Sequence, residues 1–548
     1  MEPIFTDKQL NNMSREDLIS LMKIVQEQTK KKDTEIQLLK DKQKELEFLN
    51  AMLSDRLTLA QRKQFGASSE KYAEEYEQMN LFNEAEANAD AETEELFEEI
   101  RLSSYKRKKR KGKKEEDLSN FETVETRTYK LEGEARYCPE CGKKYSVVTK
   151  ETVKRLRFIP AKFEVEEEIT YVYSCPECGS MKRPEKEPSL IRGSIATPSL
   201  VAGIMNAKYV NGMPLARQER EFARYDLDLS TKTMANWIIN CADRYLKPLY
   251  QLMKEELLES RYIHCDESRI QVLGEPDQKG TTQNWMWVYL TDEFSGSPQM
   301  VLFDYERTCA GYHPVNFLGD RFHGYLTCDG YQAYHSLGEG IIVSGCLTHA
   351  RRRFDAALTA LKKDFTKEQL KETIAYQAMS RIGILYKIEE MIHNKAPEEK
   401  YEERQKQSRP VMDALFEWLH TMEDSVDRSS LIGDAILYTL NQEAYQKRYL
   451  EDGHLSIDNN SAERALKNFA VGRRNWLFAK SVRGAGASAL VYSITETALL
   501  NHLKPYAYLT YILDELRKMG AFPKEEELKK LLPWSEDLPE YCRTKLKK

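Results

Sequence analysis

The 548-residue sequence contains no apolar run of about 18 residues, so it predicts no membrane-spanning helix. Residues 1–17 also lack the basic start and the apolar stretch of a secretory signal peptide. Cysteine is scarce: the chain has ten, and four of them form two CxxC pairs. Paired thiols without a signal peptide favour a metal site over a disulfide framework. We therefore expect a cytoplasmic protein, and one long enough to form several domains.

Glycine and proline are missing from residues 14–63, a segment that is therefore expected to be helical. Leu39, Leu46 and Leu53 repeat every seven residues, within a heptad pattern that is interrupted around residues 30–34. The pattern favours a coiled-coil arm that joins copies of the chain, and a helix folded back on the protein body is the alternative. Residues 1–72 are thus predicted to be a coiled-coil helix of a homo-oligomer.

Charge of one sign is missing from two stretches that follow. Residues 83–100 contain no lysine or arginine, whereas residues 106–114 read KRKKRKGKK and contain no acid. Blocks of like charge are typical of a solvated linker, which we assign to residues 73–125. A basic linker can also bind phosphate groups, so a contact with DNA is compatible with this assignment.

The sequence CPECG occurs twice and supplies the four paired cysteines, Cys138, Cys141, Cys175 and Cys178. Two such turns can hold a structural zinc ion in a tetrahedron of thiolates. The spacer between the pairs is longer than the common template of about 15–20 residues, and free structural cysteines are the alternative. We assign residues 126–192 to a zinc ribbon, which would have no open position for catalysis.

Helical and strand-like segments then follow one another. Residues 193–258 read as a helical domain in which Ser230 or Thr231 caps a helix, a pattern shared by helix-turn-helix DNA-binding domains and by ordinary helical hairpins. From residue 261 onward the sequence pattern becomes typical of strands, which alternate with helices and predict a mixed α/β sheet. The expected strands lie at 261–273, 284–292, 299–308, 324–328 and 340–345, with a short helix at 312–318 and a basic helix after the last strand.

This α/β core is expected in two parts. Its first part covers residues 259–360, and long charged helices at 361–452 read as an insertion. Residues 453–505 return to the core with a capped helix, and residues 506–548 form a C-terminal helical tail.

Acidic residues follow two of the strands in the same local setting. Asp266 and Asp329 each come after an apolar strand and a cysteine, in the dipeptide CD. Such an acid either starts a turn or points into a site. Neighbouring carboxylates repel unless a cation neutralises them, and oxygen ligands suit Mg²⁺ or Mn²⁺. Glu463, in the helix start DNNSAER, is the third candidate, with Asp458 and Glu496 as alternatives; surface acids without a metal would read similarly.

Basic residues gather near these acids and are candidates for DNA contacts. The alternative is a basic helix surface without a ligand, and Trp476 among them fits a protein core better than base stacking. The candidates are His349, Arg352, Arg353, Arg464, Lys467, Arg473 and Arg474.

Taken together, the motifs resemble those of the insertion sequence 66 family of DDE transposases. The resemblance rests on FGASSEK, the paired CPECG turns, CDES, CDGYQAY, GCLTHARRRF, DNNSAERALKNFAVGRRNWLF and SITETALLNHLKPYAYL, which occur in the expected order. The sequence departs from the family at Thr348, where an aromatic residue is frequent, and at His502, where glycine is common.

The resemblance implies a ribonuclease-H-like core, in which the strands before Asp266 and Asp329 lie side by side. Asp266, Asp329 and Glu463 would hold two divalent metals, Mg²⁺ or Mn²⁺, for in-line phosphoryl displacement. The implied function is cleavage and strand transfer of insertion-sequence ends, with DNA and accessory proteins of the same element as partners, at the nucleoid. A nuclease of the same fold without joining activity, and a non-catalytic zinc-containing DNA-binding or scaffold protein, are the alternatives.

Overall fold

The computed structural model describes most of the chain after residue 183 and short stretches before it. The coiled-coil, charged-linker and zinc-cysteine predictions fall outside these residues. The described residues are Glu140, Lys143, 163–174, 181–182, 184–279, 282–338, 340–362, 364–520 and 522–545. Among them, residues 345–453 form one compact unit, called the helical unit below, and the remainder form the sheet unit. Within these ranges, every helix is too short or too polar to cross a membrane.

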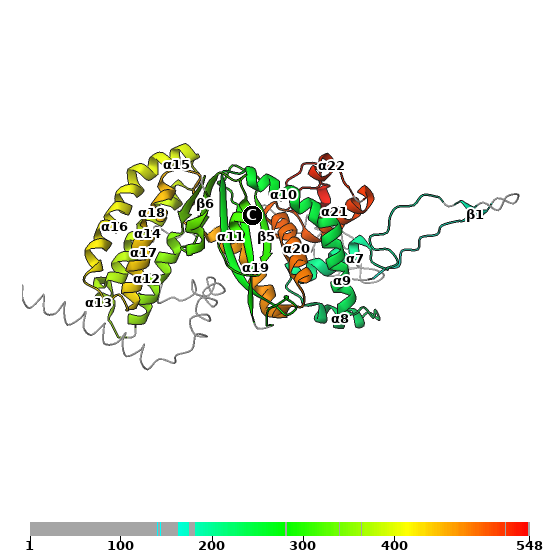
Figure 1. Ribbon diagram of the computed structural model, residues 1–548, viewed down its shortest axis with the longest axis horizontal. Helices are drawn as coiled ribbons and strands as arrows, with labels where there is room; N and C mark the ends of the chain where they lie inside the picture. The colour runs from blue at the N-terminus through cyan, green and yellow to red at the C-terminus, as the bar shows by residue number, and fades with distance from the viewer. Residues whose placement is uncertain are drawn as a thin grey trace, which may run out of the picture. The chain divides into compact units, whose positions relative to one another are not determined.

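A central mixed sheet is the core of the sheet unit (Figure 1). Its order is β5-β4-β3-β6-β7, and β8 pairs with β3 outside this path. β3 to β7 fall where the sequence predicts strands, so the expected mixed α/β sheet is confirmed, whereas β8 was not predicted. Their bounds are β3 Tyr262–Val272, β4 Gln283–Thr291, β5 Met300–Glu306, β6 Gly324–Cys328, β7 Ile341–Gly345 and β8 Phe478–Ala479.

The pairing of β3 fixes the register that matters for the acids. β3 runs antiparallel to β4 and parallel to β6, with Tyr262 opposite Tyr325 and His264 opposite Thr327. The rings of Tyr262 and Tyr325 stack with centroids 5.9 Å apart, as expected for a cross-strand aromatic pair. Continued by two residues, the same register brings Asp266 level with Asp329.

Two helices after the insertion complete the core: α19 (Asn460–Trp476) and α20 (Val482–Leu500). α19 packs on β3 and β4, whereas α20 covers the free edge of β5. Ser493 Oγ accepts the N–H of Phe303 at 2.8 Å, and Thr497 Oγ1 accepts the N–H of Val301 at 3.0 Å. Hydroxyl groups four residues apart on α20 thus accept hydrogen bonds from N–H groups two residues apart on β5. These hydrogen bonds satisfy the edge of β5, which would otherwise be open.

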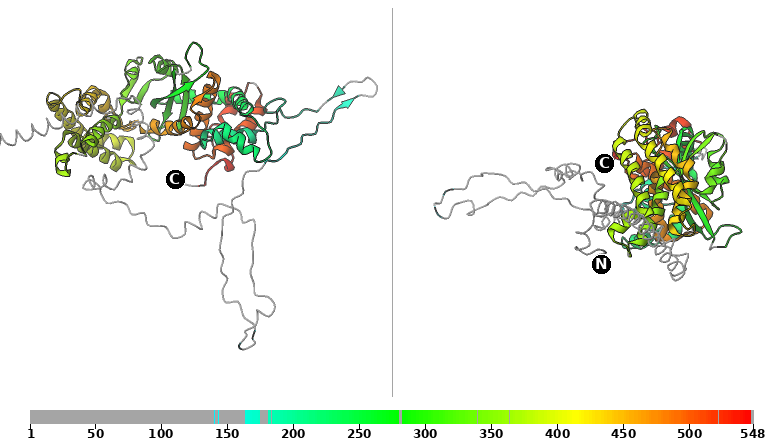
Figure 2. Two further views of the ribbon diagram at one scale, coloured as in Figure 1. Left: turned by 90° about the horizontal axis from the view of Figure 1, so that it is seen from below. Right: turned by 90° about the vertical axis from the view of Figure 1, so that its left-hand side faces the viewer.

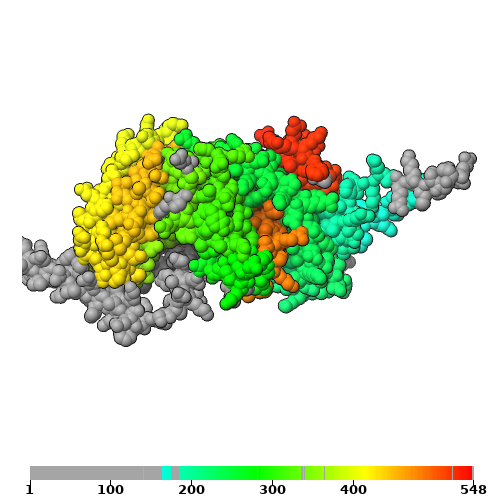
Figure 3. Space-filling view, viewed as in Figure 1, coloured from blue at the N-terminus to red at the C-terminus, as the bar shows by residue number. Residues whose placement is uncertain are grey.

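The helices of residues 198–259 belong to the same compact unit as the sheet. α7 packs on α21, and α20 contacts α9 and both π-helical turns of this region. In the space-filling view, α20 (orange) lies between the sheet residues and these helices (Figure 3). The elements are α7 Pro198–Met205, η3 Asn206–Val210, α8 Leu215–Ala223, α9 Thr231–Cys241, η4 Ala242–Leu246, α10 Lys247–Glu259, α11 Tyr312–Leu318, η5 Gln332–Ser336, α21 Pro505–Met519, α22 Glu525–Lys529 and η8 Glu540–Cys542.

Of the two predicted caps, Ser230 and Thr231, Ser230 caps α9, because its Oγ accepts the N–H of Thr233 at 3.2 Å. Residues 224–230 connect α8 to α9, which is longer than the three- or four-residue turn of a helix-turn-helix motif. α8 and α9 contact each other, and α9 also packs against α20. The pair therefore behaves as a helical hairpin within the sheet unit.

The helical unit is a bundle in which α12, α14, α16 and α17 pack on one another (Figure 2). A buried Arg404 joins its parts: the guanidinium binds both oxygens of Glu389 at 2.7 and 2.9 Å and donates to the carbonyl of Tyr449 at 3.0 Å. The helices are α12 Leu347–Leu361, α13 Lys367–Glu372, α14 Ile374–Ile392, α15 Pro397–Glu403, η6 Arg404–Ser408, α16 Arg409–Glu423, α17 Leu431–Asn441, α18 Glu443–Gln446 and η7 Lys447–Leu450.

One boundary differs from the predicted domain division. The compact helical unit begins at residue 345 and includes α12, whereas the sequence predicted that the first part of the core extends to residue 360. The reason is that the apolar side of α12 packs on α14 and α17. Earlier in the chain, β1 (Tyr173–Ser174) and β2 (Met181–Lys182) form an antiparallel pair that flanks the second CPECG turn in sequence.

Candidate active site

The first acid, Asp266, lies on β3 and is partly buried. Its pKa is raised well above the usual range because burial disfavours the charged form and because Glu267, Asp329 and Glu463 carry like charges nearby. The backbone N–H of Glu267 donates to Asp266 Oδ1 at 2.8 Å but does not offset this repulsion. The three predicted acids are thus close enough for the charges of two to act on the third.

The second acid, Asp329, directly follows the last residue of β6. Its Oδ1 accepts the N–H of Tyr331 at 2.9 Å, so the side chain does help to start a turn. The turn and the site interpretations are compatible, since one carboxylate oxygen supports the turn while the group stays beside Asp266. The sequence left these two roles as alternatives, and the structure shows the first without removing the second.

The third acid, Glu463, lies in the first turn of α19. The helix starts at Asn460, as predicted, after Asp458 accepts the N–H of Asn460 at 3.1 Å. In the described part of the chain, no three acidic side chains bring oxygens within 4.8 Å of one another. The acids of the described residues therefore lie near one another without converging on one point.

The two alternatives for the third acid have other partners. Asp458 also accepts from the side chain of Asn460 at 2.8 Å, so it organises the start of the helix. Glu496, on α20, accepts from Asn468 Nδ2 at 3.0 and 3.2 Å. Burial raises the pKa of Glu496 to about 7 despite this hydrogen bond. Among the three candidates, only Glu463 is one of the charges that raise the pKa of Asp266.

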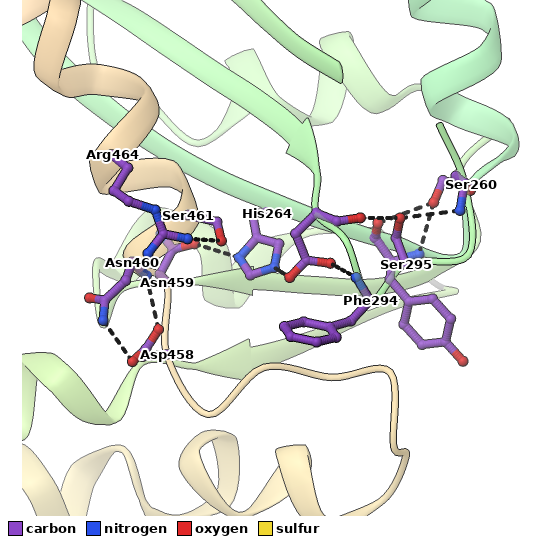
Figure 4. Close-up of polar contacts among 12 residues, drawn as sticks. Ser260, His264, Phe294, Ser295, Asp458, Asn459, Asn460, Ser461 and Arg464 are labelled. Atoms are coloured by element: carbon purple, nitrogen blue, oxygen red, sulfur yellow. Dashed lines mark hydrogen bonds and ion pairs between the residues drawn. The ribbon is translucent and has the colours of Figure 1, made fainter. Parts of the chain in front are cut away.

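A buried histidine that sequence reasoning missed ties β3 to the start of α19 (Figure 4). His264 Nδ1 lies 2.9 Å from Asn459 Oδ1, and its Nε2 lies 3.0 Å from Asp292 Oδ2. Asn459 Nδ2 donates to the carbonyl of Cys265 at 2.9 Å, which fixes the amide so that its oxygen faces the histidine. Both ring nitrogens therefore face acceptors, and His264 is held as an imidazolium.

The electrostatics agree with this charge state. Burial lowers the pKa of His264, but the charge of Asp292 and hydrogen bonds to Asp292 and Asn459 outweigh it, so the pKa is raised overall. His264 lies two residues before Asp266, on the same face of β3. Asn459 lies four residues before Glu463, so the contact links the positions of both acids. Strand alternation in YIHCDES was the signal that could have identified this histidine.

A fourth acid, Glu267, was also missed. It follows Asp266 on β3 and points to the opposite face, where the hydroxyl of Tyr334 donates to it. Burial and the charge of Asp329 raise the pKa of Glu267 to about 8. Because the sheet end holds four acidic groups, it strongly favours any cation that can bind there.

The basic candidates on α19 divide into two kinds. Arg464, Lys467 and Arg474 are exposed. Arg473 instead donates to Ser268 Oγ and to the carbonyl of Arg269, so it fastens α19 to β3. Trp476 is half-buried, with its ring 6.3 Å from that of Tyr209 and the ammonium of Lys208 5.1 Å from its ring, which agrees better with packing than with base stacking.

The remaining basic candidates lie on α12 in the helical unit. His349 and Arg352 are partly buried there. Arg353 pairs with Asp434 at 2.5 Å and lies over the ring of Tyr438 at 4.1 Å, so at least part of its role is to hold α12 against α17. Thr348, where the family often has an aromatic residue, forms a 2.7 Å hydrogen bond with the hydroxyl of Tyr386.

A mixed α/β sheet with clustered acids at its strand ends and an exposed basic helix surface beside them is an arrangement suited to DNA-processing enzymes. Comparison with known families agrees with this class. The chain belongs to the IS66 family of transposases: the model of "Transposase IS66 family" matches residues 193–487, more than half of the chain. The resemblance inferred from the motifs is thereby confirmed, and family membership supports a transposase function.

Three further models match other parts of the chain. The zinc-finger binding domain of transposase IS66 matches residues 135–179, which contain all four paired cysteines, and this supports a structural zinc. The IS66 C-terminal element matches residues 493–534, and "Transposase C of IS166 homeodomain" matches residues 52–120.

Relatives from Sinorhizobium fredii (strain NBRC 101917 / NGR234) cover most of the chain. The protein y4hP is 31% identical over 412 residues, which are 72% of this chain and 73% of the relative. The protein y4jD is 29% identical over 418 residues, 74% of this chain and 79% of the relative. Both are described as uncharacterized, so they support the family and add no activity of their own.

Proposed function

We propose that this protein is a DDE transposase that cleaves the ends of an insertion sequence and joins them to target DNA. The register of β3 and β6 is the observation that carries this proposal, because it brings Asp266 level with Asp329. The first and fourth strands of the core are neighbours, as a ribonuclease-H-like fold requires. Glu463 then supplies the third acid from α19.

The acids fit divalent metals by their chemistry. Oxygen donors suit Mg²⁺ or Mn²⁺, and the raised pKa of Asp266, caused by burial and then by the neighbouring acids, supports a site that favours a cation. Asp266 and Asp329 would be shared ligands, and Glu463 would bind one metal. When bound, a pair of metals activates the attacking oxygen and stabilises the leaving oxygen of an in-line displacement.

The residues around the acids hold and orient the reactants. The His264–Asn459 contact keeps the start of α19 at β3, so Glu463 stays beside the two aspartates. Exposed Arg464 and Lys467 follow Glu463 on the same helix and would bind DNA phosphates. A homo-oligomer would bring two DNA ends together, and accessory proteins of the element would act with it.

Strand transfer by the purified full-length protein tests the proposal. The substrates are the inverted repeats that flank its gene, supplied both intact and already cut at the 3′ end. With Mg²⁺, the wild-type protein should join cut ends to a plasmid, and Asp329→Asn should abolish joining. Asp320→Asn, an exposed acid before β6, is the matched control and should join normally.

The outcomes separate this function from its alternatives. Cleavage without joining of cut ends would identify a nuclease. DNA binding without either reaction would identify a scaffold protein. Joining by Asp329→Asn would show that the acid assignment is wrong even if the protein is a transposase.

A further inference from the structure

The end of α19 holds a leucine in a backbone conformation that favours glycine. Leu477 follows the last helical residue, Trp476, with φ 64° and ψ −45°, and its N–H donates to the carbonyl of Arg473 at 2.7 Å. A side chain at positive φ costs conformational energy that glycine avoids. Sequences that end a helix this way usually place glycine there, so the leucine side chain needs another reason.

Burial does not supply that reason. Leu477 is 66% exposed, and the adjacent Phe478 is 42% exposed. Phe478 lies in a strand: Phe478 and Ala479 form β8 and pair with Gln271 and Val272 of β3. Two apolar side chains are thus exposed to solvent beside this strand pairing, and the one of Leu477 is exposed at a conformational cost.

Positive charge leads from the acids to this pair. Arg464, Lys467 and Arg474 are exposed and lie at helical spacings of three and seven, which places them on one side of α19. Glu463 borders the start of this side, and Leu477 lies beyond its end. Lys480, also exposed, follows the apolar pair. A basic path that ends in exposed apolar side chains is complementary to DNA, in which phosphates surround apolar base faces.

We propose that Leu477 and Phe478 form an apolar wedge that inserts between base pairs of the DNA bound along α19. The proposal rests on the proposed transposase function, which makes DNA the occupant of this surface. Leu477 and Glu463 are separated by 14 residues, roughly 21 Å of helix. At about 3.4 Å per base pair, the wedge would act roughly six base pairs from the reacting phosphate.

Permanganate oxidation tests the wedge, because it detects thymines that have lost their stacking. The probe is a linear duplex with a thymine-rich centre, incubated with the full-length protein. The wild-type protein should make thymines reactive, and Leu477→Gly should reduce this reactivity about tenfold or more. Phe478→Thr, which keeps a residue suited to the strand, should reduce it as well.

His502→Gly is the matched control. His502 lies two residues after the end of α20, has φ 56° and is exposed, so its replacement by glycine relieves the same kind of backbone conformation away from the wedge. Both glycine variants should unfold at the same or a higher temperature than the wild type, but His502→Gly should keep full permanganate reactivity. A lower unfolding temperature for Leu477→Gly would give the leucine a role in the fold and overturn the proposal.

Two other results would also overturn it. Unchanged thymine reactivity in Leu477→Gly and Phe478→Thr would show that the pair does not enter DNA. A loss of oligomers in light scattering, at unchanged reactivity, would identify the surface as a contact between copies of the chain. If the wild type joins DNA ends but the variants unstack thymines normally, only the wedge proposal is wrong. If the wild type never joins DNA ends, the proposed function fails. The thymine reactivity of the variants would then still test the wedge proposal.

Discussion

Replacing Glu496 by glutamine should stabilise the protein at neutral pH without loss of DNA joining. Glu496 is 7% exposed, and its pKa is raised from 4.5 to about 7 by burial. Each tenfold change in proton affinity is worth ~1.4 kcal/mol, so ionised Glu496 costs the folded state about 3 kcal/mol at pH 8. Glutamine avoids this cost and keeps one acceptor for Asn468. The pKa of about 7 already includes the hydrogen bond from Asn468, so the expected gain is about 3 kcal/mol.

The pH dependence gives this prediction its sign. Folding raises the pKa of Glu496. The contribution of its protonated form to folding stability is therefore complete below the unfolded pKa of 4.5 and is lost as pH rises to about 7. The advantage of Glu496→Gln should therefore be absent near pH 4.5 and complete at pH 8. A gain of about 3 kcal/mol corresponds to roughly 6–12 °C in unfolding temperature for a unit of this size.

Thermal unfolding between pH 5 and pH 8 measures the gain, and the strand-transfer assay measures function. Glu536→Gln, an exposed glutamate, is the matched control and should shift neither. Glu463→Gln should abolish joining. A variant Glu496→Gln that is no more stable at pH 8 would refute the electrostatic argument, and one that joins as poorly as Glu463→Gln would make Glu496 the third acid.

Three further predictions follow from the same residues. Asn459→Ala removes a hydrogen-bond partner of the buried His264 imidazolium, so we expect the free energy of unfolding in urea to fall by ~2–4 kcal/mol. The Mg²⁺ concentration needed for half-maximal joining should rise as well, and an unchanged free energy of unfolding would contradict a stabilising role of this contact. Asp266→Asn removes a carboxylate whose pKa is strongly raised, so the metal-free variant should unfold at a higher temperature than the metal-free wild type. Mg²⁺ should raise the unfolding temperature of the wild type but not that of the variant. A variant whose unfolding temperature still rises with Mg²⁺ would place the metal elsewhere. Cys175→Ser should lower the bound zinc measured by mass spectrometry from about one ion per chain to none, and an unchanged zinc content would exclude this cysteine as a ligand.

Much of the sheet could be predicted because its signals are local. Apolar and β-branched residues alternate in the strands, and the repeated dipeptide CD is enough to single out Asp266 and Asp329. The start of α19 can be predicted from the run DNNS, because short polar side chains form hydrogen bonds with backbone groups at helix N-termini. These features depend on residues close together in the chain.

The missed features depend on contacts between distant residues. Strand alternation places His264 on the face of Asp266, but its hydrogen bond to Asn459, 195 positions later in the chain, cannot be read from the sequence. The hydroxyls of Ser493 and Thr497 likewise read as ordinary helix residues until β5 lies beside them. The positive φ of Leu477 is invisible in the sequence, because leucine normally argues for a helix that continues. His502 was noted as a departure from a common glycine, and its φ of 56° explains why glycine is common there.

The insertion of the helical unit between β7 and α19 also sets the order in which the proposed site can be made. Glu463 is synthesised 134 residues after Asp329, a delay of roughly 7–27 s at about 5–20 residues per second. During that interval the nascent chain carries two of the three acids, and its β3 lacks the contact with Asn459. A chain that terminates within the insertion would still contain the zinc cysteines and the basic linker, but it would have no complete acid set. Truncated products could then bind DNA without cutting it. The position of the insertion would therefore make a truncated chain an inhibitor of the full-length protein and not a partly active enzyme.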